Sequence, residues 1–176
     1  MIRHDVPLRE YTRFGLGGPA KGFADVSTPE ELAEVLATPG PHVLIGGGSN
    51  LVVADEGYAG TVIRYRDSQL RVDGDRIVVG TGVELQELVD ASIQEGLEGL
   101  HTMTGIPGWV GAAIYGNAGA YGQSMHQLVR SVRFFDGTSI REWRNEECGF
   151  RYRHSRFKED KSLQILSAEL ELRPGD

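Results

Sequence analysis

Three consecutive glycines, Gly46, Gly47 and Gly48, follow directly on an apolar run and precede Ser49 and Asn50. Glycine destabilises an ordered element by about 0.5–1 kcal/mol relative to alanine, so three of them in a row need a compensating use. Backbone N–H groups without Cβ atoms can approach phosphate oxygens closely, and a hydroxyl and an amide beside them would add donors. The segment therefore predicts a phosphate-binding loop, with a flexible surface loop as the alternative.

Two common phosphate-binding motifs do not fit this segment. A P-loop ends in Gly-Lys-Ser or Gly-Lys-Thr, and Ser49-Asn50 follows the glycines here without a lysine. A Rossmann fingerprint needs a further glycine that opens a helix, but Leu51 takes that place and the segment 52–57 is rich in β-branched residues and ends in glycine. What remains is a nest of N–H donors after a strand, suited to a pyrophosphate with no helix behind it.

A second glycine-rich segment runs from Thr104 to Gly122. Pro107 can start a short helix there, and small residues around it would let an extended, flat ligand lie against the main chain. Tight turns at a closely packed interface between lobes are the alternative. The glycines are Gly105, Gly108, Gly111, Gly116, Gly119 and Gly122.

Charge and cysteine content narrow the classes of partner. The net charge of −7 over 176 residues argues against a general nucleic-acid or acidic-membrane partner. Seven cations nevertheless lie between Arg141 and Lys161, which indicates a solvated face or a strip that meets an anionic small molecule. Cys148 is the one cysteine, so the chain has no internal disulfide and no cysteine-based zinc site, and we expect no metal. We expect its thiol to be buried rather than reactive.

The elements that position these loops can be predicted from periodicity. Thr28-Pro29-Glu30-Glu31 and the apolar stripe after it predict a helix over Pro29–Ala37. Strands over Lys21–Val26 and His42–Ile45 flank that helix and deliver the chain to the triple glycine. The later part predicts a strand from Thr61, a hairpin turned at Asp73-Gly74, a helix over Leu85–Ile93 ended by Gly96, and strands over Leu128–Asp136, Ser139–Trp143 and Leu163–Leu172, with Leu166, Ala168, Leu170 and Leu172 on the buried face.

These elements indicate an α+β fold with a soft boundary between two lobes near Ala54–Gly60. No run approaches eighteen apolar residues and the N-terminus lacks the apolar core of a signal peptide, so we expect a soluble, cytoplasmic protein.

Four motifs, in order along the chain, resemble one known family. Ile45-Gly-Gly-Gly-Ser-Asn-Leu-Val, Gly105-Ile-Pro-Gly-Trp-Val-Gly-Ala, Asn117-Ala-Gly-Ala-Tyr-Gly and Cys148-Gly-Phe-Arg-Tyr-Arg-His-Ser-Arg-Phe-Lys are similar to those of the UDP-N-acetylenolpyruvoylglucosamine reductases of peptidoglycan synthesis. The stretch from Tyr11 to Ala20 also resembles the family's opening, although Tyr11 stands where an asparagine is often found. The last motif is the most specific of these.

The resemblance implies an FAD-binding domain of the vanillyl-alcohol-oxidase (PCMH) type, with two α+β subdomains, 1–56 and 57–176, that hold the dinucleotide between them. It implies NADPH as co-substrate and a UDP-sugar as substrate. The cofactor-binding residues that it implies are Gly46, Gly47, Gly48, Ser49, Asn50, Leu51, Gly105, Ile106, Pro107, Gly108, Gly111, Ala112, Asn117, Gly119, Ala120 and Tyr121, of which Gly46–Asn50 would bind the pyrophosphate.

By the same resemblance, Arg153 is the catalytic, substrate-binding arginine, and Tyr152 lies near the flavin and the substrate. Reduction of the enolpyruvyl double bond moves negative charge toward the substrate's carboxylate, so a fixed cation there stabilises the transition state more than the ground state. Without the motif around them, Tyr152 and Arg153 would be interpreted as ordinary surface residues of a basic loop. The surrounding motif favours a role in the site instead.

The family's serine or cysteine proton donor and its late glutamate have no counterpart in this chain, so the resemblance implies that the C-terminal substrate-binding domain is absent from it. Two alternatives stay open. One is another FAD-dependent oxidoreductase of the same fold, and the other is a noncatalytic nucleotide-binding module.

Overall fold

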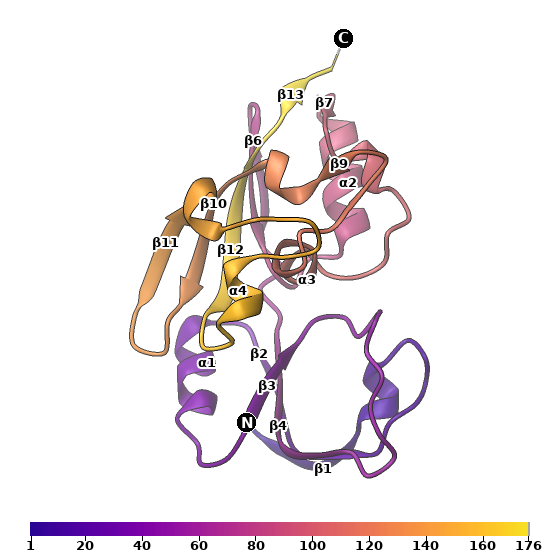
Figure 1. The fold of residues 1–176 in the computed structure, drawn as a ribbon, viewed down its shortest axis with the longest axis vertical. Coiled ribbons are helices and arrows are strands. Elements are labelled where there is room, and N and C mark those ends of the chain that lie inside the picture. Colours follow the sequence, from indigo (N-terminus) through magenta and orange to yellow (C-terminus); the bar gives the residue numbers. More distant parts are fainter. Residues whose placement is uncertain (176) are drawn as a thin grey trace. The chain divides into compact units, whose positions relative to one another are not determined.

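The computed structural model describes residues 1–175 and contains two compact units, one from Met1 to Arg66 and one from Asp67 onward (Figure 1). The sequence placed the boundary after residue 56, whereas the units divide ten residues later. The physical reason is strand β4 (Tyr58–Tyr65), which pairs with two strands of the first unit and therefore belongs to its sheet. Each unit contains both helix and strand, in keeping with an α+β fold.

The first unit is a four-stranded sheet in the order β1-β2-β4-β3. Strand β1 runs antiparallel to β2, whereas β2 and β3 both run parallel to β4. Strands β2 and β3 are thus parallel with β4 between them, so the chain must cross over from one to the other, and helix α1 lies in that connection. The bounds are β1 Arg3–Pro7, the 3-10 turn η1 Leu8–Tyr11, β2 Pro19–Val26, α1 Pro29–Leu36 and β3 His42–Ile45.

Helix α1 begins where the sequence predicted it. The Glu31 backbone N–H donates to Thr28 Oγ1 at 3.2 Å, and the Glu31 carboxylate accepts from the Thr28 N–H, which completes a capping box. Leu32 and Val35 are buried on its inner face. The crossover brings the chain into β3 in register with β4, His42 opposite Thr61, so that residues 46–50 leave the carboxyl end of a parallel strand.

The second unit is a five-stranded antiparallel sheet in the order β11-β10-β12-β6-β5, with two short two-stranded sheets beside it. The predicted hairpin is present between β5 and β6, but its two turn residues are Gly74 and Asp75, one position later than predicted, because Asp73 still pairs with Arg76. The strands are β5 Leu70–Asp73, β6 Arg76–Gly80, β7 Leu97–Glu98, β8 Gly119–Ala120, β9 Gln123–Ser124, β10 Val129–Phe135, β11 Ile140–Arg144, β12 Gln164–Glu171 and β13 Arg173–Pro174, and the helical segments are α2 Leu85–Gln94, η2 His101–Met103, α3 Val110–Tyr115, η3 Met125–Gln127, η4 Asn145–Cys148 and α4 Arg156–Glu159.

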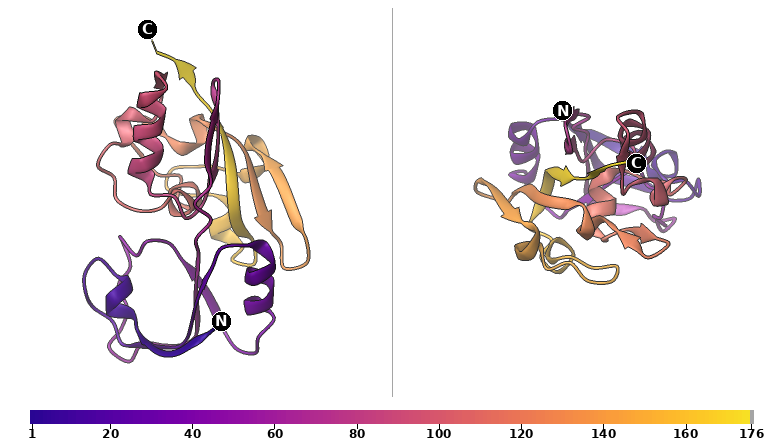
Figure 2. Two further views of the ribbon diagram at one scale, coloured as in Figure 1. Left: turned by 180° about the vertical axis from the view of Figure 1, so that it is seen from behind. Right: turned by 90° about the horizontal axis from the view of Figure 1, so that it is seen from above.

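Helices α2 and α3 cover one face of this sheet (Figure 2). Leu88 of α2 and Ile114 of α3 pack with Ile77 and Phe134 of the strands in one continuous core. Burial of such side chains is the main favourable contribution to folding, at about 25 cal/mol per Å² of apolar surface.

The predicted buried positions of β12 are confirmed, and one further residue is buried at the start of the strand. Leu166, Ala168, Leu170 and Leu172 are all buried, and so is Ile165, which the alternation did not predict. The register shifts there, because Phe134 of β10 lies opposite Ile165 while the preceding Arg133 lies opposite Ser167. The resulting β-bulge adds one residue, so the neighbours Ile165 and Leu166 are both buried where strict alternation would bury only one of them.

No helix of the described chain is long and apolar enough to cross a membrane.

Cys148 lies at the end of η4, where its side chain is fully buried and its Sγ donates to the Arg144 carbonyl at 3.4 Å. Desolvation by burial, and then the neighbouring carboxylates of Glu147 and Glu146, raise the pKa of this thiol to about 12. We therefore expect iodoacetamide at pH 8 to leave the folded chain unlabelled, because the thiolate is the nucleophile. Mass spectrometry before and after addition of denaturant measures this, and equal labelling in both states would contradict the prediction.

Candidate functional site

The first glycine loop follows β3 in the first unit. Gly47 and Asn50 are exposed, Gly46 and Ser49 are half-buried and Gly48 is buried. Within residues 1–175, the backbone N–H groups of positions 46–50 donate none of the hydrogen bonds that the loops make. A row of backbone donors that the protein itself does not use has the chemistry of an anion-binding cradle. This loop therefore fits a phosphate or pyrophosphate group.

Gly48 has a second reason to be glycine. Its φ is +69°, and a Cβ built on it would lie 1.9 Å from the carbonyl oxygen of Tyr11. The carbonyl of Gly48 accepts a hydrogen bond from the Arg13 N–H at 3.1 Å. From the sequence we explained the glycines by the close approach of a ligand. At Gly48 the close approach of the Tyr11 carbonyl is already enough to exclude a side chain.

Arg13 is a residue that the sequence analysis missed. It is the second residue of a turn in which the Gly15 N–H donates to the Thr12 carbonyl at 3.1 Å and Thr12 Oγ1 donates to the Leu16 carbonyl at 2.9 Å. The Arg13 side chain is exposed and makes no ion pair with any residue of the described chain. The backbone of Arg13 therefore lies beside the loop, and its side chain is an exposed cation without an ion pair in the described chain. Its position in the opening motif, Tyr11-Thr-Arg-Phe, was the signal that could have identified it.

The second glycine segment lies in the second unit, before and within α3. The Gly105 N–H donates to Gln86 Oε1 at 2.8 Å, and the Gly108 carbonyl accepts from the Leu85 N–H at 2.8 Å. A Cβ on Gly111 would lie 2.6 Å from the Cβ of Thr81, so α3 can approach that residue only with glycine there. Ile106 is half-buried, and Ala112 is exposed on α3.

Pro107 does not start the short helix that was expected from it. Helix α3 begins at Val110, three residues later. The backbone of the intervening Gly108 has a φ of +122°, which lies outside the right-handed helical region and delays the helix. Pro107 is exposed in the resulting loop.

Asn117 anchors the third motif from a buried position. Its Nδ2 donates to the Arg151 carbonyl at 2.9 Å, and its Oδ1 accepts from the His126 N–H at 3.0 Å. Gly119 and Ala120 form β8, and Tyr121 projects into solvent with 93% of its surface exposed. The amide of Asn117 thus has a structural use that joins the third motif to the fourth.

Tyr152 and Arg153 lie at the exposed tip of a tight turn in the fourth motif. Arg153 Nη2 donates to the Gly119 carbonyl at 3.0 Å, and its Cζ lies 5.7 Å from the centre of the Tyr152 ring. The structure therefore brings the third and fourth motifs together. Gly46–Leu51 belong to the first unit, and all the other residues predicted for the site belong to the second.

The other cations of the basic run are mostly neutralised or committed to nearby groups. Arg141 Nε lies 2.7 Å from the Asp136 carboxylate, and Arg151 Nη2 lies 2.6 Å from that of Glu159. Arg156 donates to the Glu147 carbonyl. Arg153 pairs with no carboxylate in the described chain, which leaves its charge available to an anionic ligand.

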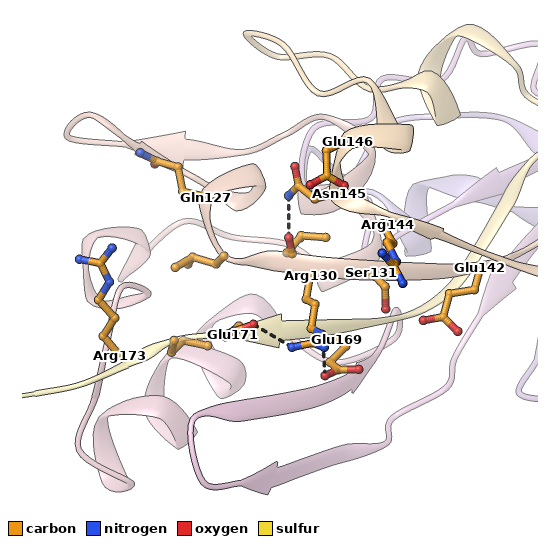
Figure 3. A pocket seen from close by; sticks show the side chains of 13 residues that line it. Gln127, Arg130, Ser131, Glu142, Arg144, Asn145, Glu146, Glu169, Glu171 and Arg173 are labelled. Carbon is orange, nitrogen blue, oxygen red and sulfur yellow. Dashed lines mark hydrogen bonds and ion pairs between the residues drawn. The ribbon is translucent and has the colours of Figure 1, made fainter.

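A cavity of about 710 Å³ lies elsewhere in the second unit, on the face of the sheet opposite the core (Figure 3). Arg130 lies there between Glu169 at 3.5 Å and Glu171 at 3.0 Å. The cavity contains none of the residues predicted for the site, and it mixes both signs of charge. Its lining is Gln127, Leu128, Val129, Arg130, Ser131, Glu142, Arg144, Asn145, Glu146, Glu169, Glu171, Leu172 and Arg173.

Comparison with known proteins relates this geometry to flavoproteins. The chain is 47% identical to the UDP-N-acetylenolpyruvoylglucosamine reductase of Solibacter usitatus over 99% of its length and 57% of that protein. It is 45% identical to the reductase of Thermobifida fusca, over 88% of the chain and 46% of that protein. The chain spans about half the length of the curated relatives it matches.

Two solved structures of flavoproteins are also similar to this chain. The UDP-N-acetylenolpyruvylglucosamine reductase (MurB) of Thermus caldophilus has a TM-score of 0.87 and 35% identity, over 100% of this chain and 64% of that one. 6-Hydroxy-D-nicotine oxidase of Arthrobacter nicotinovorans has a TM-score of 0.64 at 18% identity, over 88% of this chain and 37% of that one, which relates the fold alone. The predicted α+β fold of the vanillyl-alcohol-oxidase type is confirmed. A family model described as an FAD binding domain matches residues 20–140, and the chain therefore belongs to that family.

Proposed function

We propose that this chain is the FAD-binding part of an NADPH-dependent UDP-N-acetylenolpyruvoylglucosamine reductase, which forms UDP-N-acetylmuramate for peptidoglycan synthesis in the cytoplasm. The observation that carries the proposal is the 47% identity to a reductase of that name over 99% of the chain. A C-terminal domain of the same protein supplies the proton donor and further contacts to the UDP-sugar.

In this proposal the N–H groups of Gly46–Asn50 bind the pyrophosphate, with Leu51 beside them. Five consecutive donors in the described chain are without a partner of their own, which supports this role. The remaining cofactor contacts come from the second unit: Gly105, Ile106, Pro107, Gly108, Gly111, Ala112, Asn117, Gly119, Ala120 and Tyr121. Bound between these contacts, FAD would supply hydride transfer from NADPH to the substrate.

Arg153 then binds the carboxylate of the enolpyruvyl group, and Tyr152 contacts the substrate from the same turn. The planar guanidinium can donate two parallel hydrogen bonds to one carboxylate, so it fixes orientation as well as charge. As the double bond is reduced, the carboxylate gains negative charge, and the fixed cation stabilises the transition state. The absence of a carboxylate partner for Arg153 in the described chain supports this role.

The decisive experiment uses residues 1–176 expressed alone. We expect the purified chain to show the visible absorption of oxidised flavin, after reconstitution with FAD if needed, and to oxidise no NADPH in response to the enolpyruvyl substrate. The full-length protein is the positive control for turnover. Substrate-dependent NADPH oxidation by the isolated chain would contradict the division of labour proposed here, and a chain that stays colourless after reconstitution would favour a noncatalytic module.

The same sample distinguishes the reductase from an oxidase of this fold. Many such oxidases anchor FAD covalently through a histidine in the first glycine loop, whereas Asn50 and Leu51 follow the glycines here. Acid denaturation should therefore release all of the flavin into the supernatant. Flavin that precipitates with the polypeptide would favour the oxidase.

A further inference from the structure

The turn that carries Tyr152 and Arg153 is closed by two backbone hydrogen bonds. The Arg151 N–H donates to the His154 carbonyl and the His154 N–H donates to the Arg151 carbonyl, both at 3.1 Å. Arg153 has a φ of +53°, a left-handed conformation that is disfavoured for a residue with a Cβ. Such a conformation persists only where the surroundings enforce it. The orientation of Arg153 therefore depends on what holds the two flanks of the turn.

One carboxylate oxygen of Glu159 contacts the residues on both sides of the turn, Arg151 and His154. Its Oε1 accepts from Arg151 Nη2 at 2.6 Å and lies 2.8 Å from His154 Nε2. His154 Nε2 also lies 2.8 Å from Arg151 Nη2, and it donates to Glu159 in the forms that carry a proton on that nitrogen. The His154 hydrogen bond is the largest cause that holds the pKa of the Glu159 carboxyl below its usual range, so the group is an anion at neutral pH. Charge-assisted bonds of this kind are shorter and stronger than neutral ones.

Helix α4 gives Glu159 a fixed base. Ser155, just before the helix, is fully buried and its Oγ donates to the Tyr115 carbonyl at 2.7 Å. Phe157, within the helix, is fully buried in the core of the second unit. The carboxylate is therefore carried by an element that is itself anchored, while the tip of the turn is exposed.

We propose that Glu159 is a positioning residue, which clamps Arg151 and His154 so that Arg153 is presented in one orientation. This inference rests on the substrate-binding role proposed for Arg153. Exposed ion pairs contribute little to global stability, so loss of the clamp should loosen the turn without unfolding the protein.

The test compares Glu159→Gln with Glu142→Gln in the full-length protein. Glu142 is exposed on β11 and makes no ion pair in the described chain, so its variant controls for the loss of one charge. We expect Glu159→Gln to lower kcat for the enolpyruvyl substrate by about 10-fold to 100-fold, the scale of a misplaced catalytic group, with the thermal midpoint and flavin content unchanged. Glu142→Gln should match the wild type.

A second measurement reads the turn without any turnover. Trypsin cleavage within residues 151–154 should become several-fold faster in Glu159→Gln, because cleavage of a native protein follows the population of its opened form. Unchanged kcat would overturn the proposal, even if cleavage became faster, and so would a fall in kcat without faster cleavage. Arg153→Lys, measured in parallel, distinguishes a failure of the Glu159 proposal from a failure of the role proposed for Arg153. If Arg153→Lys also retains full turnover, the role of Arg153 itself is wrong.

Discussion

Arg153→Lys in the full-length protein is expected to lower turnover by about 10²-fold or more while the flavin content stays that of the wild type. Lysine keeps the positive charge and, like arginine, has a Cβ, so the cost of the backbone at φ +53° is nearly the same in both proteins. What the variant loses is the planar fork that binds a carboxylate through two hydrogen bonds. The expected loss therefore measures oriented charge stabilisation rather than charge alone.

Steady-state NADPH oxidation at saturating substrate and the flavin-to-protein absorbance ratio give the two readouts. Arg133→Lys is a matched control, since Arg133 is an exposed arginine of β10 in the same unit without an ion pair in the described chain. Its turnover should equal that of the wild type. Unchanged turnover in Arg153→Lys would remove this arginine from the reaction, and loss of flavin would place it in cofactor binding instead.

The parts of the fold that the sequence predicted are those with local causes. Helix α1 carries its own start signal in Thr28 and Glu31 and its own apolar stripe, so no distant residue is needed to place it. The hairpin likewise depends on a two-residue turn, which lies at Gly74-Asp75, one residue after the predicted position. The order of the four motifs was also sufficient to predict the flavin-binding fold.

The parts that it missed depend on partners far away in the chain. Strand β1 was not predicted, because Arg3–Pro7 is a short edge strand without clear alternation and acquires its conformation by pairing with β2. The burial of Ile165 in addition to Leu166 accompanies a register shift against β10. Neither feature leaves a pattern in its own segment.

The candidate site was likewise predicted only in part. Residue types in the motifs predicted where donors and cations lie along the chain, including the loop at Gly46–Asn50. They did not predict that Arg153 would contact the Gly119 carbonyl or that Glu159 would hold the turn beneath it. Those contacts join segments that only the folded second unit brings together.

Gly48→Ala is expected to destabilise the first unit and to weaken FAD binding together. The left-handed backbone at φ +69° costs alanine about 1–2 kcal/mol, and the new Cβ would meet the Tyr11 carbonyl oxygen 1.9 Å away. A backbone atom cannot rotate aside as a side chain does, so residues 11–13 must move, and with them the hydrogen bond from Arg13 to Gly48. The unused N–H donors of the loop would then no longer converge.

Gly74→Ala is the control that separates the cost of the left-handed backbone from the cost of the contact with the Tyr11 carbonyl. Gly74 lies in the hairpin between β5 and β6 with φ +62°, and a Cβ on it would meet nothing within 4 Å. This variant therefore measures the backbone term alone and should retain wild-type affinity for FAD. Thermal unfolding and flavin fluorescence titration of both variants give the comparison. Because a 1 kcal/mol loss shifts the midpoint of a domain of this size by about 2–4 °C, the excess in Gly48→Ala is measurable. Equal midpoints and equal FAD affinities in the two variants would mean that the contact with Tyr11 does not shape the loop.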